Sequence, residues 1–156
     1  MSFDASAFNP EAFLDATLTD PTERRKPLPV GDYTAIIGAV TARAWQGRAD
    51  TTKSGIAWDI PLTIDVPAAV QAELGMDQST LNLKDSIMLD LTDNGTIDNG
   101  PGKNRRLRAY REATDMNKPG DVFSARKMEG KVILVKIAHE MWEGQPIERV
   151  TGVVAA

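Results

Sequence analysis

An all-β domain that carries one main helix is the fold class that this sequence of 156 residues predicts. Several segments alternate apolar and polar residues with a period of two, which is typical of strands with a buried face. Turn-forming Gly and Pro residues separate these segments, as they do between short strands. The predicted strands are residues 31–44, 55–66, 86–91, 131–138 and 147–154.

The second predicted strand, residues 55–66, has the cleanest alternation. Its apolar face includes Trp58, so we expect this tryptophan in the core. Pro61 on the opposite face fits an edge strand or a bulge, because proline cannot donate a ladder hydrogen bond. Gly38 in the first predicted strand likewise indicates a bulge or a bend.

The main helix is predicted over residues 105–114, between the third and fourth strands. Asn104 is a suitable cap, and Leu107, Tyr110 and Thr114 form an apolar stripe. A shorter helix is predicted within residues 67–75. Three strands, a helix and two strands follow the order of the OB-fold, a five-stranded Greek-key barrel whose first and fourth inter-strand loops flank an oligonucleotide groove. We therefore predict an OB-fold domain over residues 30–156.

Residues 1–29 are predicted to form an acidic N-terminal arm. Residues 1–23 contain five acids and no base, and Pro21, Pro27 and Pro29 exclude a long helix beyond residue 20. A short helix is compatible with residues 10–17, because proline is tolerated at the first helical position. The arm is expected to be flexible or packed on the surface, and a segment that binds a partner is the alternative.

Composition limits the classes of protein that are compatible with the sequence. The absence of cysteine excludes disulfides and thiolate metal sites. The first residues lack the apolar block of a signal peptide, and no apolar run has membrane-spanning length, so a cytoplasmic protein is expected. The net charge is −4, but outside residues 1–23 there are 18 bases and 17 acids. Local clusters of bases could therefore still bind a phosphate backbone.

Two tryptophans lie in predicted loops, Trp45 in residues 45–53 and Trp142 in residues 139–146. Large aromatic side chains usually bury most of their surface. In a loop beside cations, such a side chain favours the stacking of a flat ligand such as a base. Packing of Trp45 across its loop or against a second subunit is the alternative. The predicted nucleic-acid-binding residues are Trp45, Trp142, Arg43, Arg48, Lys53, Lys136, Lys103 and Arg105.

Catalytic, metal and cofactor motifs are weak, so no enzyme activity, metal or cofactor is predicted. His139 is the only histidine and has no helical pair of acids near it. The segment from Asp90 resembles the front of a calcium loop, but Pro101 occupies the twelfth position where a bidentate Glu is needed. Gly102-Lys103 lacks the glycine spacing and the hydroxyl residue of a phosphate-binding P-loop.

Short motifs along most of the chain resemble a family of phage-encoded single-stranded-DNA-binding proteins. The resemblance implies an OB-fold, sequence-tolerant binding of single-stranded DNA, and a role in phage DNA replication or recombination. The motifs are Phe13-Leu14-Asp15-Ala16-Thr17, Leu28-Pro29-Val30-Gly31-Asp32-Tyr33-Thr34-Ala35, Lys53-Ser54-Gly55, Arg106-Leu107-Arg108 and Met128-Glu129-Gly130-Lys131-Val132.

Single-stranded DNA is therefore the predicted partner. Other replication or recombination proteins, bound through the arm, and a second copy of the chain are further candidates. The alternative is an OB-like protein-interaction or structural module, such as a phage assembly or host-takeover factor, that binds no nucleic acid. In that case the loop tryptophans would be oligomer contacts.

Overall fold

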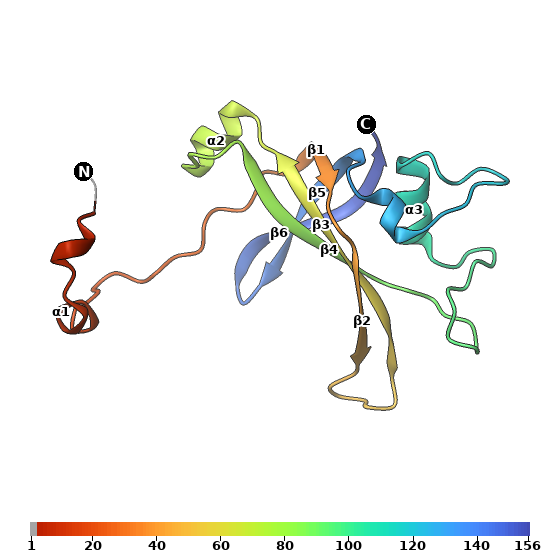
Figure 1. The fold of residues 1–156 in the computed structure, drawn as a ribbon, viewed down its shortest axis with the longest axis horizontal. Coiled ribbons are helices and arrows are strands. Elements are labelled where there is room, and N and C mark those ends of the chain that lie inside the picture. Colours follow the sequence, from red (N-terminus) through yellow and green to blue (C-terminus); the bar gives the residue numbers. More distant parts are fainter. Residues whose placement is uncertain (1–2) are drawn as a thin grey trace.

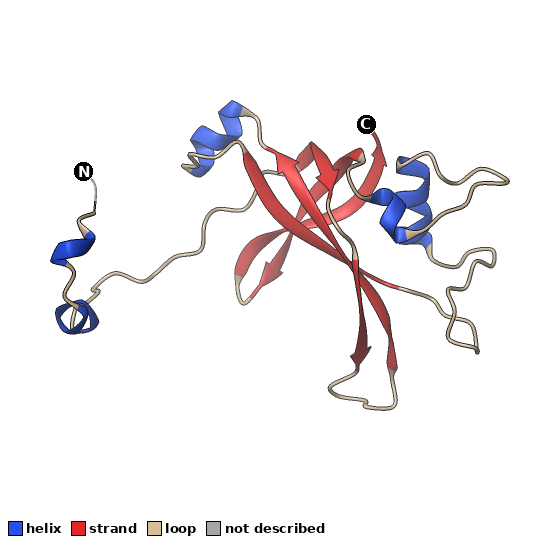
Figure 2. Cartoon of the chain, in the orientation of Figure 1, coloured by secondary structure: helices blue, strands red, loops and turns tan. Residues whose placement is uncertain are grey.

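A six-stranded antiparallel sheet forms most of the protein in the computed structural model, which describes residues 3–156 (Figures 1 and 2). The few helices lie outside the sheet. The strands are β1 (Gly31–Ile37), β2 (Thr41–Gln46), β3 (Ser54–Asp65), β4 (Thr80–Met88), β5 (Val132–Trp142) and β6 (Gln145–Ala155). The helices are α1 (Pro10–Leu14), α2 (Ala68–Leu74) and α3 (Arg105–Ala113), with 3-10 turns at Ala5–Ala7 and Ala125–Met128.

The longest strand, β3, organises the sheet. One edge of β3 pairs with β4. The other edge of β3 pairs with β2 along its first half and with β1 along its second half. The other edge of β1 pairs with β5, which pairs with β6. Within residues 3–156 β4 and β6 form no ladder with each other, so the sheet is open between them.

The prediction of five strands was wrong, because the predicted first strand (residues 31–44) is divided into β1 and β2. The break follows Ile37 and contains Gly38, whose N–H donates to the carbonyl of Pro61 at 2.8 Å. A Cβ added at Gly38 would lie only 3.3 Å from Cβ of Pro61. The chain therefore bends at a residue without a side chain, opposite a proline, before it resumes pairing with β3.

The predicted loop of residues 139–146 is instead the end of a hairpin. β5 continues through Trp142, which pairs with Gln145. Only Glu143 and Gly144 lie between the strands, with φ of 49° and 78°. Two consecutive residues with positive φ are typical of the tight turns that match the twist of a hairpin. The predicted loop of residues 45–53 is likewise shorter, because Trp45 and Gln46 belong to β2.

One face of the sheet contains the core. Ile60, Leu62 and Ile64 of β3 are almost fully buried, and Trp58 on the same face is 8% exposed, which confirms its predicted core position. α3 lies between β4 and β5 in the chain, packs next to β6, and buries Leu107 and Tyr110 of the predicted stripe together with Ala113. Thr114, the third residue of the predicted stripe, follows the helix and is also buried.

A buried carboxylate joins α3 to β4. The hydroxyl of Tyr110 donates to Asp85 Oδ2 at 2.7 Å, and Arg106 forms an ion pair with the same oxygen. Burial raises the pKa of the Asp85 carboxyl, and the Tyr110 hydrogen bond and the Arg106 charge oppose this effect. Asn104 occupies the predicted N-cap position of α3, but its side chain forms no capping hydrogen bond with the helix. Its side chain instead bonds the backbone of Asp90 and Asp98.

The N-terminal arm extends away from the sheet and carries α1 (Figure 1). The predicted helix of residues 10–17 is shorter, because α1 ends at Leu14. Near its root the arm runs along the β5–β6 hairpin: His139 Nε2 donates to the carbonyl of Leu28 at 2.5 Å, and Leu28 is fully buried. No helix within residues 3–156 has the length and apolar character needed to cross a membrane.

Candidate nucleic-acid interface

The face of β2, β3 and β4 that points away from the core brings several candidate residues together. Arg43 of β2 lies opposite Ala57 of β3, which lies opposite Met88 of β4. Trp45 lies opposite Gly55 in the adjacent row, closer to the hairpin end. Because residues paired across strands share a face, this row arrangement defines one continuous surface, which we call the outer face.

Trp45 is seated on this outer face and is half-buried. A Cβ added at Gly55 would lie 2.8 Å from Nε1 of Trp45 and 2.9 Å from its Cε2 and Cζ2. The indole therefore lies directly against the Gly55 backbone, and only glycine leaves room for it. Nε1 is buried without a hydrogen-bond partner within residues 3–156. The prediction of Trp45 in a loop was wrong, because the residue belongs to β2, where its side chain is partly exposed.

Arg43, one row from Trp45, is held by an acid. Its Nε donates to Asp59 Oδ2 at 3.0 Å, and Ser86 Oγ donates to Asp59 Oδ1 at 2.6 Å. The hydrogen bond from Ser86 has the largest effect on the Asp59 carboxyl. Together with Arg43 it holds the pKa of this carboxyl below its ordinary value. Asp59 therefore fixes the position of Arg43 and neutralises part of its charge.

Two residues of the outer face were missed by the sequence analysis. Met88 is 58% exposed and lies in the same row as Arg43. Lys84 lies opposite Pro61, two residues before Ser86. Both were missed because the third strand was predicted to begin at residue 86, whereas β4 begins at Thr80. Leu81, Leu83 and Ile87 alternate on its inner face, but Asp85 interrupts their apolar pattern.

Arg48 and Lys53 lie in the connection of residues 47–53, beyond the outer face. This loop is closed by the N–H of Gly47, which donates to the carbonyl of Lys53 at 2.8 Å, and by Gln46 Nε2, which donates to the carbonyl of Thr51 at 2.8 Å. Within residues 3–156 neither Arg48 nor Lys53 forms an ion pair. The β2–β3 hairpin thus presents Trp45 together with two unpaired cations.

Lys136 and Trp142 are not brought to this hairpin. They lie on β5, separated from β2 in the sheet order by β3 and β1. Trp142 is 54% exposed and shares a hollow of about 350 Å³ with residues 21–24 of the arm. Arg24 reaches Glu143 beside it at 3.4 Å. Trp142 is therefore a second exposed aromatic residue, on a hairpin of its own.

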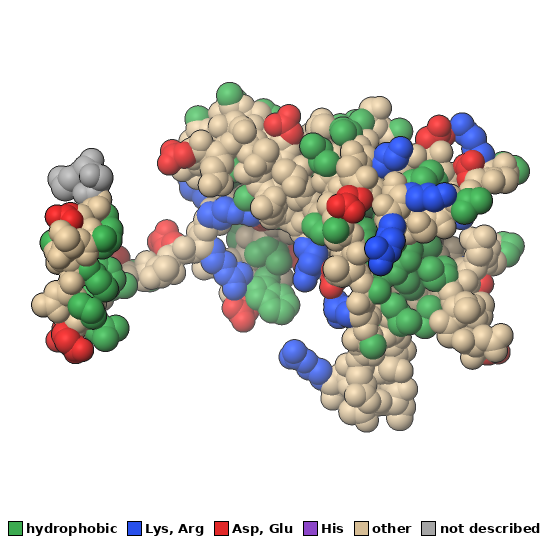
Figure 3. Space-filling view, in the orientation of Figure 1, with side chains coloured by type: hydrophobic (Ala, Val, Ile, Leu, Met, Phe, Trp, Pro, Cys, Tyr) green, Lys and Arg blue, Asp and Glu red, His purple; other side chains and the backbone are tan. Residues whose placement is uncertain are grey.

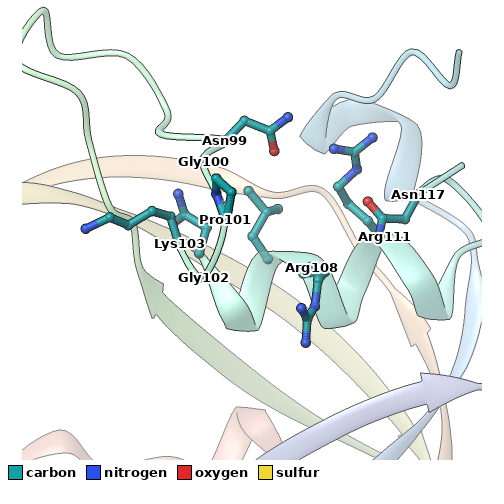
Figure 4. A pocket seen from close by; sticks show the side chains of 10 residues that line it. Asn99, Gly100, Pro101, Gly102, Lys103, Arg108, Arg111 and Asn117 are labelled. Carbon is teal, nitrogen blue, oxygen red and sulfur yellow. The ribbon is translucent and has the colours of Figure 1, made fainter. Parts of the chain in front are cut away.

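Lys103 and Arg105 lie near the start of α3, also away from Trp45. Lys103 lines a pocket of about 210 Å³ between residues 99–104 and α3. Figure 4 shows that its side chain points away from α3, and that Arg108 points away from the loop. Arg111 is already bound, since its Nε donates to the carbonyl of Met116 at 2.9 Å. The cations of this pocket diverge, so they do not form a convergent anion site.

Lys and Arg side chains are scattered over the body of the protein in the view of Figure 3. Residues with metal-binding chemistry, in contrast, do not gather: residues 3–156 contain no group of three His, Asp or Glu that could hold a metal ion. His139 is engaged by the Leu28 carbonyl. The sequence matches no known protein-family model and no curated protein.

Proposed function

We propose that the protein is a non-enzymatic OB-fold protein that binds single-stranded DNA, with a role in phage DNA replication or recombination. The observation that carries the proposal is the partly exposed side chain of Trp45 on a sheet face with Arg43 and Lys84, next to two loop cations. Bases are free to stack only when they are unpaired, so a stacking surface favours single strands.

The arrangement of strands supports the OB-fold. If β1 and β2 are counted as one bent strand, the path β4-β3-β1-β5-β6 has the third, second, first, fourth and fifth strands of the chain in succession. α3 lies between the third and fourth of these strands, as in an OB-fold. The β2–β3 and β5–β6 hairpins then correspond to the two loops that flank the oligonucleotide groove.

Stacking and charge act together on the outer face. Trp45 offers a flat ring, and Met88 adds an exposed, polarisable apolar side chain one row away. Base–aromatic stacking contributes ~1–3 kcal/mol per base and tolerates any base. Arg43, Arg48, Lys53 and Lys84 supply about four contacts to phosphates. Trp142 on the β5–β6 hairpin provides a second aromatic surface along the path of the bound single-stranded DNA.

The test is a titration of the full chain with oligothymidine and with duplex DNA of equal length, monitored by tryptophan fluorescence. We expect tighter binding of the single strand and quenching of fluorescence. The log of the association constant should fall linearly with the log of the salt concentration, at a slope of roughly −2 to −4, which corresponds to about four phosphate contacts. A preference for duplex DNA, or a flat salt response, would contradict the proposal.

A protein-interaction module is the second candidate, because large apolar side chains of the arm are exposed. A protein-interaction module should bind neither single-stranded nor duplex DNA. This candidate also predicts that the substitution Trp45→Ala changes association between proteins and leaves the interaction with DNA unaltered. The same titration separates the two candidates.

A further inference from the structure

The N-terminal arm has an aromatic cluster that does not contact the body of the protein. Phe3, Phe8 and Phe13, which we call the arm cluster, are 75%, 49% and 69% exposed. Their rings meet edge to face, with centroids 6.3 Å and 5.6 Å apart. Figure 3 shows the apolar side chains of the arm standing clear of the body. A contiguous exposed apolar surface of this kind marks an interaction site.

A second apolar surface lies on the side of β1, β5 and β6 that points away from the core. Ile36 pairs with Val132, and Leu134 pairs with Val154, so the four side chains form one block, which we call the sheet patch. Ile36 and Val132 are each 48% exposed and Val154 is 41% exposed. The core lies under the opposite face, so no other part of the described chain covers this patch.

Charge differs between the two surfaces. The arm cluster is interleaved with acids, Asp4, Glu11 and Asp15, and α1 carries no base. On β5 the sheet patch is bordered by Lys136, which lies opposite Asp32 of β1 and forms no ion pair within residues 3–156. An apolar, acidic segment therefore faces an apolar patch that has a cation at its border.

The arm is poorly placed to cover the patch of its own copy. Its root runs along the β5–β6 hairpin toward the turn, with Arg25 bound to Glu148 and Arg24 to Glu143. From Glu143 back to Val132 the strand spans roughly 36 Å. The eleven steps from Arg24 to Phe13, the nearest member of the arm cluster, reach at most about 40 Å when fully extended, and they must also turn around the edge of the sheet. The arm of a second copy is not subject to this limit.

We propose that the arm cluster of one copy docks on the sheet patch of a second copy. In a symmetric pair the arm of each copy binds the sheet patch of the other. The dimer therefore contains two identical contacts, and all four apolar surfaces are covered. Ile36 lies opposite Thr63 of β3, on the same side of the sheet as Trp45, but Trp45 lies opposite Gly55 near the other end of β3. The proposal does not rest on DNA binding, because its test measures the association of the protein alone.

The test is the association state of the full chain, measured by sedimentation equilibrium over a wide range of concentrations. The arm variant combines Phe3→Ser, Phe8→Ser and Phe13→Ser, and the patch variant combines Ile36→Lys and Val132→Lys. Val122→Lys is the matched control, because Val122 is 74% exposed and lies outside both surfaces. We expect the parent and the control to dimerise, and each variant to dimerise at least about tenfold more weakly. Thermal melting verifies that all variants fold.

Mixing the two variants gives the decisive result. The patch variant retains a normal arm and the arm variant retains a normal patch, so the mixture can form one complete contact and should associate more tightly than either variant alone. A monomeric parent would overturn the proposal, as would a patch variant that dimerises like the parent. A mixture that associates no better than its components would show that each arm binds its own copy.

Discussion

The indole of Trp45 lies against the backbone of Gly55, its partner across the β2–β3 ladder, so closely that no side chain fits between them. A glycine in a strand lacks a side chain to pack, and an aromatic residue from the neighbouring strand can cover it. Gly55 therefore acts as a positioning residue, because it determines how the ring is presented.

Gly55→Ala should displace the ring. The new Cβ would meet three indole atoms at 2.8–2.9 Å, so the side chain must leave its seat. We expect weaker binding of oligothymidine, by ~1–3 kcal/mol, together with a red-shifted tryptophan emission from the more exposed ring. Gly152→Ala is the matched control, because its Cβ would lie 3.7 Å from Cδ of Lys136, an ordinary contact. Equal affinities of Gly55→Ala and the parent would refute the positioning role.

The tryptophans should separate binding from stability. Trp45→Ala should weaken binding of oligothymidine by ~1–3 kcal/mol and should lower stability less than Trp58→Ala does, because Trp45 is the more exposed of the two side chains. Trp58→Ala should lower the free energy of unfolding by ~3–5 kcal/mol through a core cavity. Trp142→Ala should weaken binding less than Trp45→Ala, since Glu140 and Glu143 flank it. Urea unfolding and fluorescence titration of each variant measure the two quantities.

Asp59 should make stability depend on pH. Its pKa is lowered in the folded state, chiefly by the Ser86 hydroxyl and then by Arg43, so the ionised carboxylate stabilises the fold. This contribution is fully present above the ordinary value of 3.8 and is lost as the pH falls through the lowered pKa. Asp59→Asn should therefore lower the free energy of unfolding at pH 7, and the difference from the parent should shrink in acid. Urea unfolding at a series of pH values tests this, and a difference that grows in acid would contradict it.

Leu28 should contribute to the stability of the fold, whereas the more N-terminal residues of the arm should not. Leu28→Ala should lower the free energy of unfolding by ~2–5 kcal/mol, because the side chain is fully buried. Leu18→Ala, at a side chain that is 85% exposed, should change it by less than about 0.5 kcal/mol. Chemical unfolding of both variants provides the comparison. A mild effect at Leu28 would mean that the root of the arm detaches without disturbing the sheet.

Local pattern was enough to predict much of this fold. The period-two alternation of residues 55–66 predicted β3 and the core position of Trp58, and the stripe of Leu107 and Tyr110 predicted α3. The reason is that a strand or helix with one buried face repeats its pattern along the chain, whatever it packs against. The same reasoning failed for β4, because the buried Asp85 interrupts the apolar pattern and depends on Tyr110 and Arg106, which are distant in sequence.

By itself the sequence determined the mostly β architecture, the order of its main elements and the candidate status of Trp45 and its neighbouring cations. Only the tertiary structure decided that the first strand breaks at Gly38, that Leu28 is buried, and that Trp45 rests on Gly55 in a row with Arg43 and Met88. Each of these features is a relationship between residues on different strands. Alternation along a strand assigns a side chain to a face, whereas the register between strands determines which side chains become its neighbours.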